Sequence, residues 1–190
     1  IEIVENIANY IEKEEQLNLQ MIIRPHPQNV KGYLSDKSWL PRLKKLENLK
    51  KTSVFYPLLA DGDIPWQMNF SDLDTLSTAI QGSYAVLNTC STFAIDGMLN
   101  DKPVIMTPFD SNKILNYWLS SRKQLDIIHI NKFIKTTKPY VANSYENLFK
   151  LLSSTLKVSC NESDIKYYNY GYKSNATEIT INNLRQLLSA

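Results

Sequence analysis

Apolar positions along the chain follow two spacings, which together predict helices alternating with short strands. Apolar residues three or four positions apart indicate helices near residues 3–16, 39–49, 71–82, 93–99, 112–121, 144–152 and 179–188. Short continuous apolar runs indicate buried strands near residues 19–23, 52–56, 84–88, 102–108 and 127–130. Buried strands separated by amphipathic helices are typical of βαβ units. The pattern therefore predicts an α/β domain with a mainly parallel sheet.

Helix boundaries and domain organisation follow from the residues between these runs. Ser71 and Ser144 precede apolar helical runs and are expected to cap them, and Gly82 is expected to end the first. The chain has no internal repeat and no low-complexity linker, so residues 1–190 are expected to form one domain. Parallel sheets bind ligands at the carboxyl ends of their strands, which directs attention to the loops after the first and third predicted strands.

Composition and charge exclude several classes of function. The 190 residues include 21 Lys and Arg against 19 Asp and Glu, so a strongly basic surface for nucleic acid is not expected. No apolar run approaches the roughly 18 residues of a membrane span, and no signal peptide is visible. Two cysteines and two histidines argue against a disulfide framework and a zinc site. Because the chain begins at Ile1 rather than Met, we expect a fragment whose partner sequence lies upstream.

The clearest candidate site is a strand, a hydroxyl-rich turn and a short helix within residues 86–105. Thr89, Ser91 and Thr92 lie in the turn, where backbone N–H groups and the helix dipole favour a phosphate. Asp96 interrupts the apolar helix that follows, and its carboxylate has the chemistry to accept the hydroxyls of a ribose. The alternative is that Ser91 simply caps the helix.

A second candidate site follows the first predicted strand, in residues 24–27. Two prolines restrict the backbone there, and Arg24 and His26 stand beside them. An Arg at a strand end can clamp a phosphate, and a His can donate to a phosphate or act as an acid or base. The alternative is a rigid turn that carries a surface His.

The two segments together resemble the C-terminal, nucleotide-binding half of a GT-B glycosyltransferase. The likeness is to bacterial capsule polysaccharide synthesis proteins and CDP-glycerol glycerophosphotransferases, which carry an (R/K)-x-H-P loop and a later S-(S/T)-x-x-x-(E/D) segment ending in K-P-V-I. Residues 24–27 and 91–105 match these motifs, and the resemblance covers residues 17–110. This chain has Asp96 where those families usually carry Glu, and Asp101 where they commonly carry Gly.

The resemblance implies a Rossmann-like three-layer domain, one half of a GT-B fold, that binds a nucleotide-activated donor. By that likeness Arg24 and His26 face the diphosphate or the transferred group, with His26 as the catalytic residue. Thr89, Ser91 and Thr92 then bind phosphate, and Asp96 binds the ribose. The donor, a nucleotide-sugar or CDP-polyol, is the substrate, so no cofactor and no metal are expected.

The same likeness implies a transferase in bacterial cell-envelope biogenesis that makes surface polysaccharide. The acceptor is then a glycan or a lipid-linked molecule, and a missing N-terminal domain supplies its site, so this chain alone is expected to bind the donor without turning it over. We expect a cytoplasmic protein, in peripheral contact with the inner face of the membrane at most. The alternatives are a nucleotide-sugar 2-epimerase on the same architecture and a degenerate transferase module without catalysis.

Other noticeable residues are assigned structural roles at this stage. The D-x-D sequences at residues 61–63 and 72–74 are interpreted as a turn and as part of a helix cap rather than as metal ligands. Cys90 has no basic neighbour in the sequence and is interpreted as a packing residue. Trp66 and Phe70 could stack on a base, but packing is the favoured interpretation.

Overall fold

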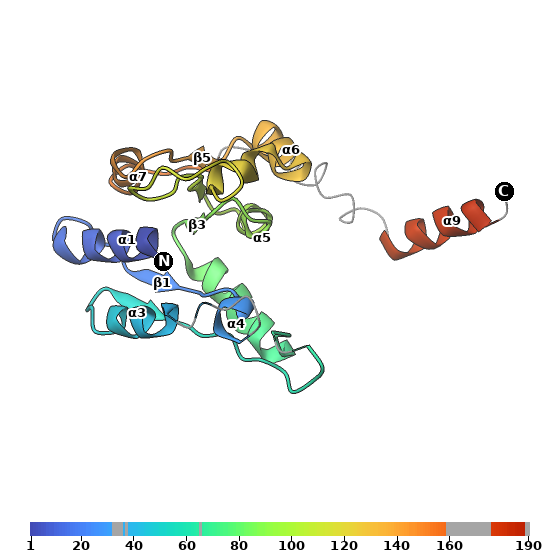
Figure 1. Ribbon diagram of the computed structural model, residues 1–190, viewed down its shortest axis with the longest axis horizontal. Helices are drawn as coiled ribbons and strands as arrows, with labels where there is room; N and C mark the ends of the chain where they lie inside the picture. Colours follow the sequence, from blue (N-terminus) through green and yellow to red (C-terminus); the bar gives the residue numbers. More distant parts are fainter. Residues whose placement is uncertain (32–35, 37, 65, 159–175, 189–190) are drawn as a thin grey trace.

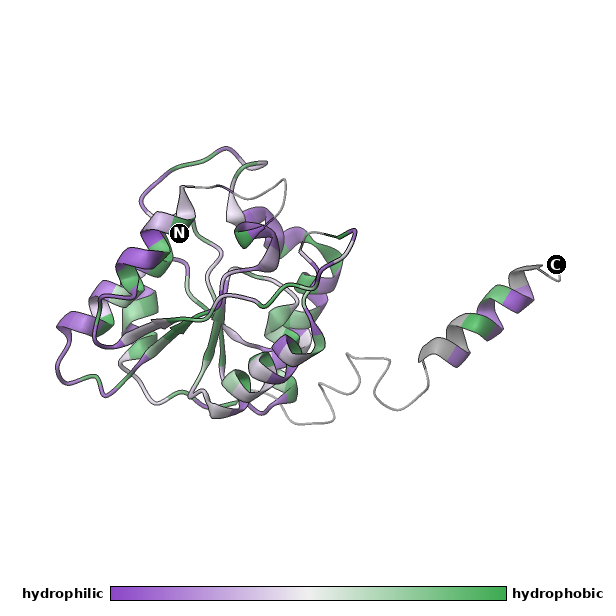
Figure 2. Ribbon diagram, turned by 90° about the horizontal axis from the view of Figure 1, so that it is seen from below, coloured by the Kyte–Doolittle hydropathy of each residue, from purple (hydrophilic) through white to green (hydrophobic). Residues whose placement is uncertain are grey.

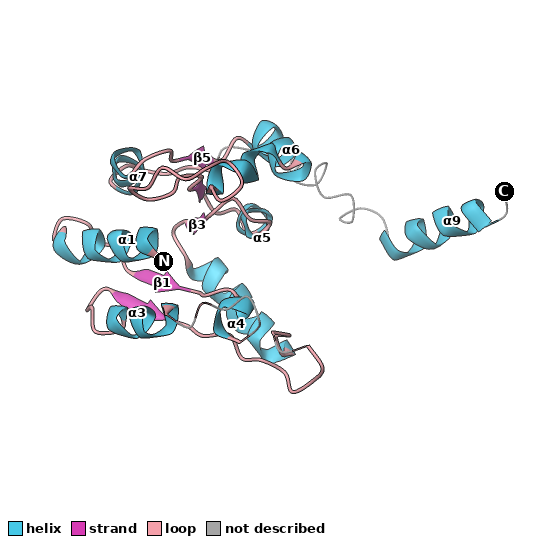
Figure 3. Ribbon diagram, viewed as in Figure 1, coloured by secondary structure: helices cyan, strands magenta, loops and turns pink. Residues whose placement is uncertain are grey.

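The computed structural model describes residues 1–31, 36, 38–64, 66–158 and 176–188, and it is an α/β structure (Figure 1, Figure 3). Its helices are α1 (Glu2–Lys13), α2 (Pro27–Val30), α3 (Trp39–Leu46), α4 (Phe70–Gly82), α5 (Phe93–Leu99), the 3₁₀ helix η1 (Ser121–Asp126), α6 (Ile128–Thr137), α7 (Tyr145–Leu152) and α9 (Ala176–Leu188). Its strands are β1 (Met21–Ile23), β2 (Thr52–Val54), β3 (Val86–Asn88), β4 (Val104–Met106) and β5 (Tyr140–Val141). Residues 167–172 include four tyrosines and are expected from the sequence to form an irregular aromatic tail; they lie outside the described residues.

All paired strands within the described ranges are parallel, as predicted, but they form two small sheets rather than one. β1 pairs with β2 in one sheet, and β3, β4 and β5 follow in that order in the other. Figure 2 shows the strands together at the centre of the body, with the helices around them. The α/β class and the parallel pairing are therefore confirmed.

Helices pack against both faces of the three-stranded sheet. Successive side chains of a strand point to opposite faces, and the buried clusters follow that alternation. Val86, Val104 and Met106 pack in one cluster with residues of α4, α5 and α6. Leu87 and Ile105 belong to another cluster with residues of α1 and α7. Residues of helices therefore pack on both faces of this sheet.

Helix α1 joins the two sheets. Its buried residues Ile7 and Ile11 pack in the cluster that contains Ile105. Ala8, on the adjacent side of the helix, packs with Ile23 of β1 and with α3. One amphipathic helix thus covers the boundary between β1 and β3, strands that are not hydrogen-bonded neighbours.

The predictions for residues 112–130 are wrong. The expected helix at 112–121 is a loop with turns, followed by η1, and the expected strand at 127–130 is the start of α6. Ile130 and Phe133 are buried on one face of α6, which is helical spacing, whereas the short apolar run before them was compatible with either element. In the 112–121 segment the apolar side chains are exposed, so no burial supports a helix.

The helix caps agree with prediction at one helix and differ at another. Ser144 Oγ accepts a hydrogen bond from Asn147 N at 3.2 Å and caps α7, as predicted. The cap of α4 is Asn69 rather than Ser71, because Asn69 Oδ1 accepts the bond from Asp72 N at 2.8 Å. Ser71 Oγ instead donates to Asn69 Oδ1 at 2.9 Å, which supports the cap from its side. The helix ends at Gly82, as predicted.

Helix α5 and the turn after it have a tight geometry. A Cβ added at Gly97 would lie 2.9 Å from Val104 Cγ2 and 3.1 Å from Val86 Cβ, so only glycine lets α5 approach β3 and β4 this closely. Asp101 follows the helix with a φ of 55°, in the left-handed region that favours glycine. Asp101 therefore occupies a position whose backbone conformation favours Gly.

Among the residues that the structure describes, no helix combines the length and the apolar character that crossing a bilayer requires.

Candidate functional site

The amino ends of β1 and β2 lie at one end of α1. Lys51, just before β2, donates from Nζ to the carbonyl of Ile11 at 3.0 Å, and its own carbonyl accepts from Met21 N at 2.8 Å. The other end of α1 therefore lies toward the carboxyl ends of these strands. There Glu2 forms an ion pair of 2.7 Å with Lys113, from the loop after β4. The loops after β1 and β4 thus leave the same edge of the structure.

A second ion pair brings the end of β3 to that edge. Arg24, the residue after β1, forms an ion pair with Asp72 in the first turn of α4. Because α4 leads directly into the start of β3, its first turn lies on the side where β3 ends. The two segments singled out from the sequence, residues 24–27 and the turn at 89–92, are therefore both at the carboxyl edge of the strands.

The turn after β3 is built around Asn88, a residue that the sequence interpretation left out. Asn88 is 9 % exposed, and its Oδ1 accepts from Ser91 N at 2.9 Å. Its carbonyl accepts from Thr107 N at 2.9 Å, which ties the turn to the end of β4. The Asn88 Nδ2 atom is buried and has no hydrogen-bond partner among the described residues. A buried amide donor without a partner is costly, and it marks a position where a ligand or a water can accept.

The hydroxyl groups of the turn point toward solvent rather than into the core. Thr89, Ser91 and Thr92 are exposed, while Cys90 between them is 2 % exposed and adopts a φ of 59°. The residue before α5 is Thr92, and it makes no side-chain capping bond. The alternative in which Ser91 is the cap of α5 is therefore not what the structure has.

Burial decides the role of Cys90. Its side chain packs with Ala94 and Met98 in the core, and this burial raises the pKa of the thiol to about 12. The group stays protonated at neutral pH and is a packing residue, as expected.

Asp96 lies one turn into α5 and is exposed. Neighbouring protein atoms desolvate its carboxylate and raise its pKa above the ordinary value. Its carboxylate has no hydrogen-bond or ion-pair partner within the described part of the chain. An exposed carboxylate without an internal partner is accessible to a ligand, so Asp96 stays a candidate for ligand binding.

Arg24 makes contacts that the sequence did not predict. Its guanidinium donates to Asp72, which is 1 % exposed, and its Nη2 lies 3.8 Å from Met68 Sδ. Asp72 also accepts from Leu58 N at 2.8 Å, so this carboxylate joins β1, the loop after β2 and α4. The sequence interpretation assigned Asp72 to a helix cap, because acidic residues favour the first turn of a helix. Its ion pair with Arg24, 48 residues away in the sequence, could not be predicted from local sequence.

His26 caps the short helix α2. Its Nδ1 accepts from Gln28 N at 3.2 Å, so the proton of the neutral ring is on Nε2. The imidazole is exposed, and Nε2–H is therefore a donor directed away from the helix terminus. This tautomer suits hydrogen bonding to an anionic oxygen.

A groove of about 520 Å³ lies between α1, α3 and residues 111–113, and none of the predicted site residues lines it. Two ion pairs, Arg42 with Glu5 and Lys113 with Glu2, neutralise charges in its lining. Within the described ranges, no three His, Cys, Asp or Glu side chains are grouped so as to hold a metal ion.

Trp66 is half-buried, whereas Phe70 is 89 % exposed, so the packing role favoured for Phe70 is wrong.

No protein-family model matches the chain, and comparisons with curated proteins and with solved structures found no match either.

Proposed function

We propose that this chain is the donor-nucleotide-binding domain of a glycosyltransferase or polyol-phosphate transferase that makes bacterial surface polysaccharide. The finer fold belongs to the same proposal: a Rossmann-like three-layer domain, one half of a GT-B enzyme. The observation that carries the proposal is the turn at residues 88–92, with exposed hydroxyls and a buried Asn88 amide that lacks a partner. Such a turn at the carboxyl edge of parallel strands is suited to a phosphate-bearing ligand.

The proposed roles follow from the donors and acceptors at this edge. The hydroxyls of Thr89, Ser91 and Thr92 donate to phosphate oxygens without adding charge. His26 donates from Nε2 to the diphosphate and stabilises the negative charge that develops as the bond to the leaving group breaks. Asp96 accepts from ribose hydroxyls, which supplies the hydrogen bonds that its carboxylate lacks in the free protein.

Arg24 keeps a modified role in the proposal. A guanidinium has five N–H donors, and the pair with Asp72 uses only part of them. The side chain is 16 % exposed, so the remaining donors are close to the surface. Asp72 then holds the guanidinium in place, and the pair contributes local charge rather than a freely moving clamp.

Titration calorimetry and thermal unfolding with CMP, CDP, UDP, GDP and their sugar or glycerol conjugates test the proposal. A ligand that binds the native state raises its apparent stability by mass action. We expect one nucleotide class to bind, and Asp96→Ala and His26→Ala each to weaken it by about 1–3 kcal/mol. Asp74→Ala is the matched control, because Asp74 is an exposed acidic residue on a helix. No response to any nucleotide, or an equal loss in the control, would count against the proposal.

A further inference from the structure

The loop after β4 exposes an unusual run of large apolar side chains. Ile114 is fully exposed, Trp118 is 75 % exposed and Leu119 is 70 % exposed, and Leu115 and Tyr117 are exposed beside them. None of these five residues belongs to a buried cluster of the described chain. Packing of the core therefore does not account for them.

Polar contacts, rather than these side chains, hold the loop in shape. Asp110 Oδ1 accepts from Ser121 N at 2.7 Å and from Ser121 Oγ at 2.8 Å, which closes the loop at its base. Lys123 Nζ donates to the Trp118 carbonyl at 2.6 Å. Tyr117 OH donates to Asp126 at 2.8 Å, and its ring lies edge-on to Trp118 with centroids 5.2 Å apart. The apolar side chains are thus presented on an ordered backbone.

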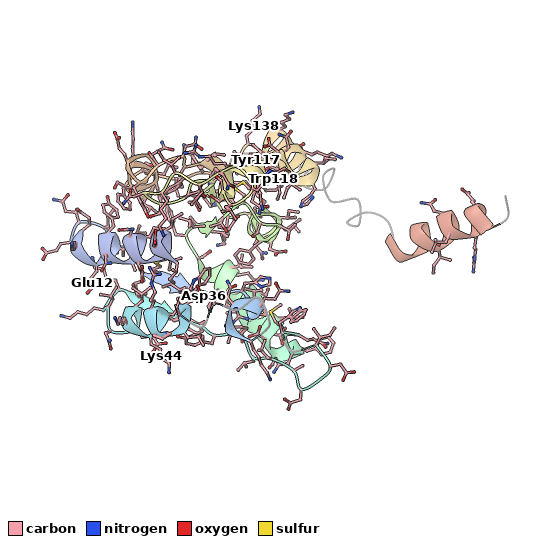
Figure 4. The ribbon with its side chains drawn as sticks, viewed as in Figure 1. Glu12, Asp36, Lys44, Tyr117, Trp118 and Lys138 are labelled. Atoms are coloured by element: carbon pink, nitrogen blue, oxygen red, sulfur yellow. The ribbon has the colours of Figure 1, made fainter. Side chains whose placement is uncertain are left out.

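The same part of the chain is strongly basic. Residues 114–138 contain one acidic residue, Asp126, and five basic residues: Arg122, Lys123, Lys132, Lys135 and Lys138. The whole chain has almost balanced charge, so this segment carries an excess of positive charge that the rest of the chain lacks. In Figure 4 the labelled side chains of Tyr117, Trp118 and Lys138 lie on the upper side of the molecule, in the part that carries α6.

Helix α6 continues the pattern from the loop. Ile130 and Phe133 face the core, while Ile128, Lys132 and Lys135 lie four and then three residues apart on the other side. Ile128 is 86 % exposed. The hydrogen bond from Tyr117 to Asp126 ties the loop to the end of η1. Asp126 in turn lines a groove together with Ile128, Lys132 and Lys135 of α6. The exposed apolar and basic side chains of residues 114–138 are here called the basic apolar surface.

We propose that the basic apolar surface, residues 114–138, docks on an anionic lipid bilayer. A bilayer with acidic lipids presents negative headgroups directly above an apolar layer, which matches a loop of Trp, Tyr and aliphatic residues flanked by Lys and Arg. Trp118 and Tyr117 lie at the level of the headgroups, Ile114 and Leu119 reach the acyl boundary, and the basic side chains contact lipid phosphates. This inference does not depend on the proposed nucleotide site.

Vesicle sedimentation measures this binding directly. The probes are phosphatidylcholine vesicles with about one-third phosphatidylglycerol, and pure phosphatidylcholine vesicles. We expect binding to the first only, and a decrease with added salt because the attraction is screened. Binding should shift the tryptophan emission to the blue, and Trp118→Phe should remove that shift while Trp39 and Trp66 remain.

Variants separate the apolar and the charged contributions. Ile114→Ser with Trp118→Ala should lower the partition coefficient at least tenfold. Arg122→Gln with Lys135→Gln should lower it about 20-fold at low salt, and should leave the response to nucleotides unchanged. Phe70→Ala is the matched control, because Phe70 is an exposed aromatic residue in a segment, 58–74, that has four acidic and no basic residues. This control should bind vesicles like the unaltered protein.

Three results would overturn the proposal. The first is no binding to anionic vesicles, and the second is equal binding by the Ile114→Ser, Trp118→Ala double variant. The third is a concentration-dependent dimer, seen by sedimentation velocity and abolished by Trp118→Ala, without vesicle binding. That result would assign the basic apolar surface to a second copy of this chain instead of to a lipid surface.

Discussion

The loops after β3 and β4 leave neighbouring strands that are in register, Val86 with Val104 and Asn88 with Met106, yet they present opposite chemistry. The turn after β3 buries Cys90 in the core and exposes hydroxyl groups. The loop after β4 satisfies its polar groups internally and exposes Trp118 with other large apolar residues.

The difference teaches that position at the carboxyl edge does not by itself decide what a loop binds. Polar groups that lack internal partners favour a polar ligand, because binding supplies their missing hydrogen bonds. Apolar side chains held outside the core favour a surface that removes them from water. We therefore expect changes near the β3 turn to affect nucleotide binding alone, and changes in the β4 loop to affect vesicle binding alone.

The largest expected effect is from Asp72→Ala, which leaves Arg24 without its buried partner. Breaking such a pair costs about 3–5 kcal/mol in the free energy of unfolding, and Leu58 N also loses its acceptor. Urea denaturation measures the change, with Asp74→Ala expected to stay within about 0.5 kcal/mol. Equal stability of the two variants would show that the ion pair does not hold the β1 loop against α4.

The next effect is from Gly97→Ala, which places a methyl group 2.9 Å from Val104 Cγ2. Overpacking of this kind costs about 1–3 kcal/mol, and α5 must shift, so nucleotide binding should weaken while vesicle binding stays unchanged. Gly82→Ala is the control, because a Cβ there meets nothing within 4 Å. A loss of vesicle binding in Gly97→Ala would break the comparison between the two loops.

Asp96→Asn should have a smaller effect on stability, and in the opposite direction. The pKa of Asp96 is raised in the folded protein, so folding favours the protonated form. The contribution of Asp96 to the free energy of unfolding is therefore fully present at pH values below the pKa of this group in the unfolded chain. That contribution is lost as the pH rises through the pKa of the group in the folded protein. At pH 7 the variant should unfold at a slightly higher temperature yet bind nucleotide less tightly, and the stability difference should disappear near pH 3. A variant that is less stable at pH 7 would contradict this.

Trp118→Ala should change stability least, by no more than about 0.5 kcal/mol, because the side chain is mostly in water. Thermal unfolding measures this, and nucleotide binding should be unchanged. A large loss of stability would mean that Trp118 contributes to folding, and the contrast between the β3 turn and the β4 loop would then fail.

Local patterns were sufficient for several elements. The helix at residues 93–99, the cap at Ser144 and the end of α4 at Gly82 all match prediction, because each depends on residues within one or two turns. The predictions for residues 112–130 are wrong because short apolar runs fit more than one element, and only burial of Ile130 and Phe133 distinguishes them.

The position of the two candidate segments at strand ends was predictable, whereas their contacts were not. The order of strands and turns placed residues 24–27 and 89–92 at strand ends, and the structure has both at one edge. The role of Asn88 and the pairing of Arg24 with Asp72 were not predictable, because burial and a partner 48 residues away leave no local pattern.

By itself the sequence determined the α/β class, the parallel arrangement and the segments that carry polar chemistry, since these follow from periodicity and short-range rules. Only the tertiary structure decided which polar groups keep a partner and which apolar groups stay outside the core. Asp72 forms an ion pair with Arg24, and Asn88 Nδ2 has no partner among the described residues. Trp118 remains mostly exposed to solvent. These outcomes depend on desolvation and on contacts between distant segments, which exist only once the chain has folded.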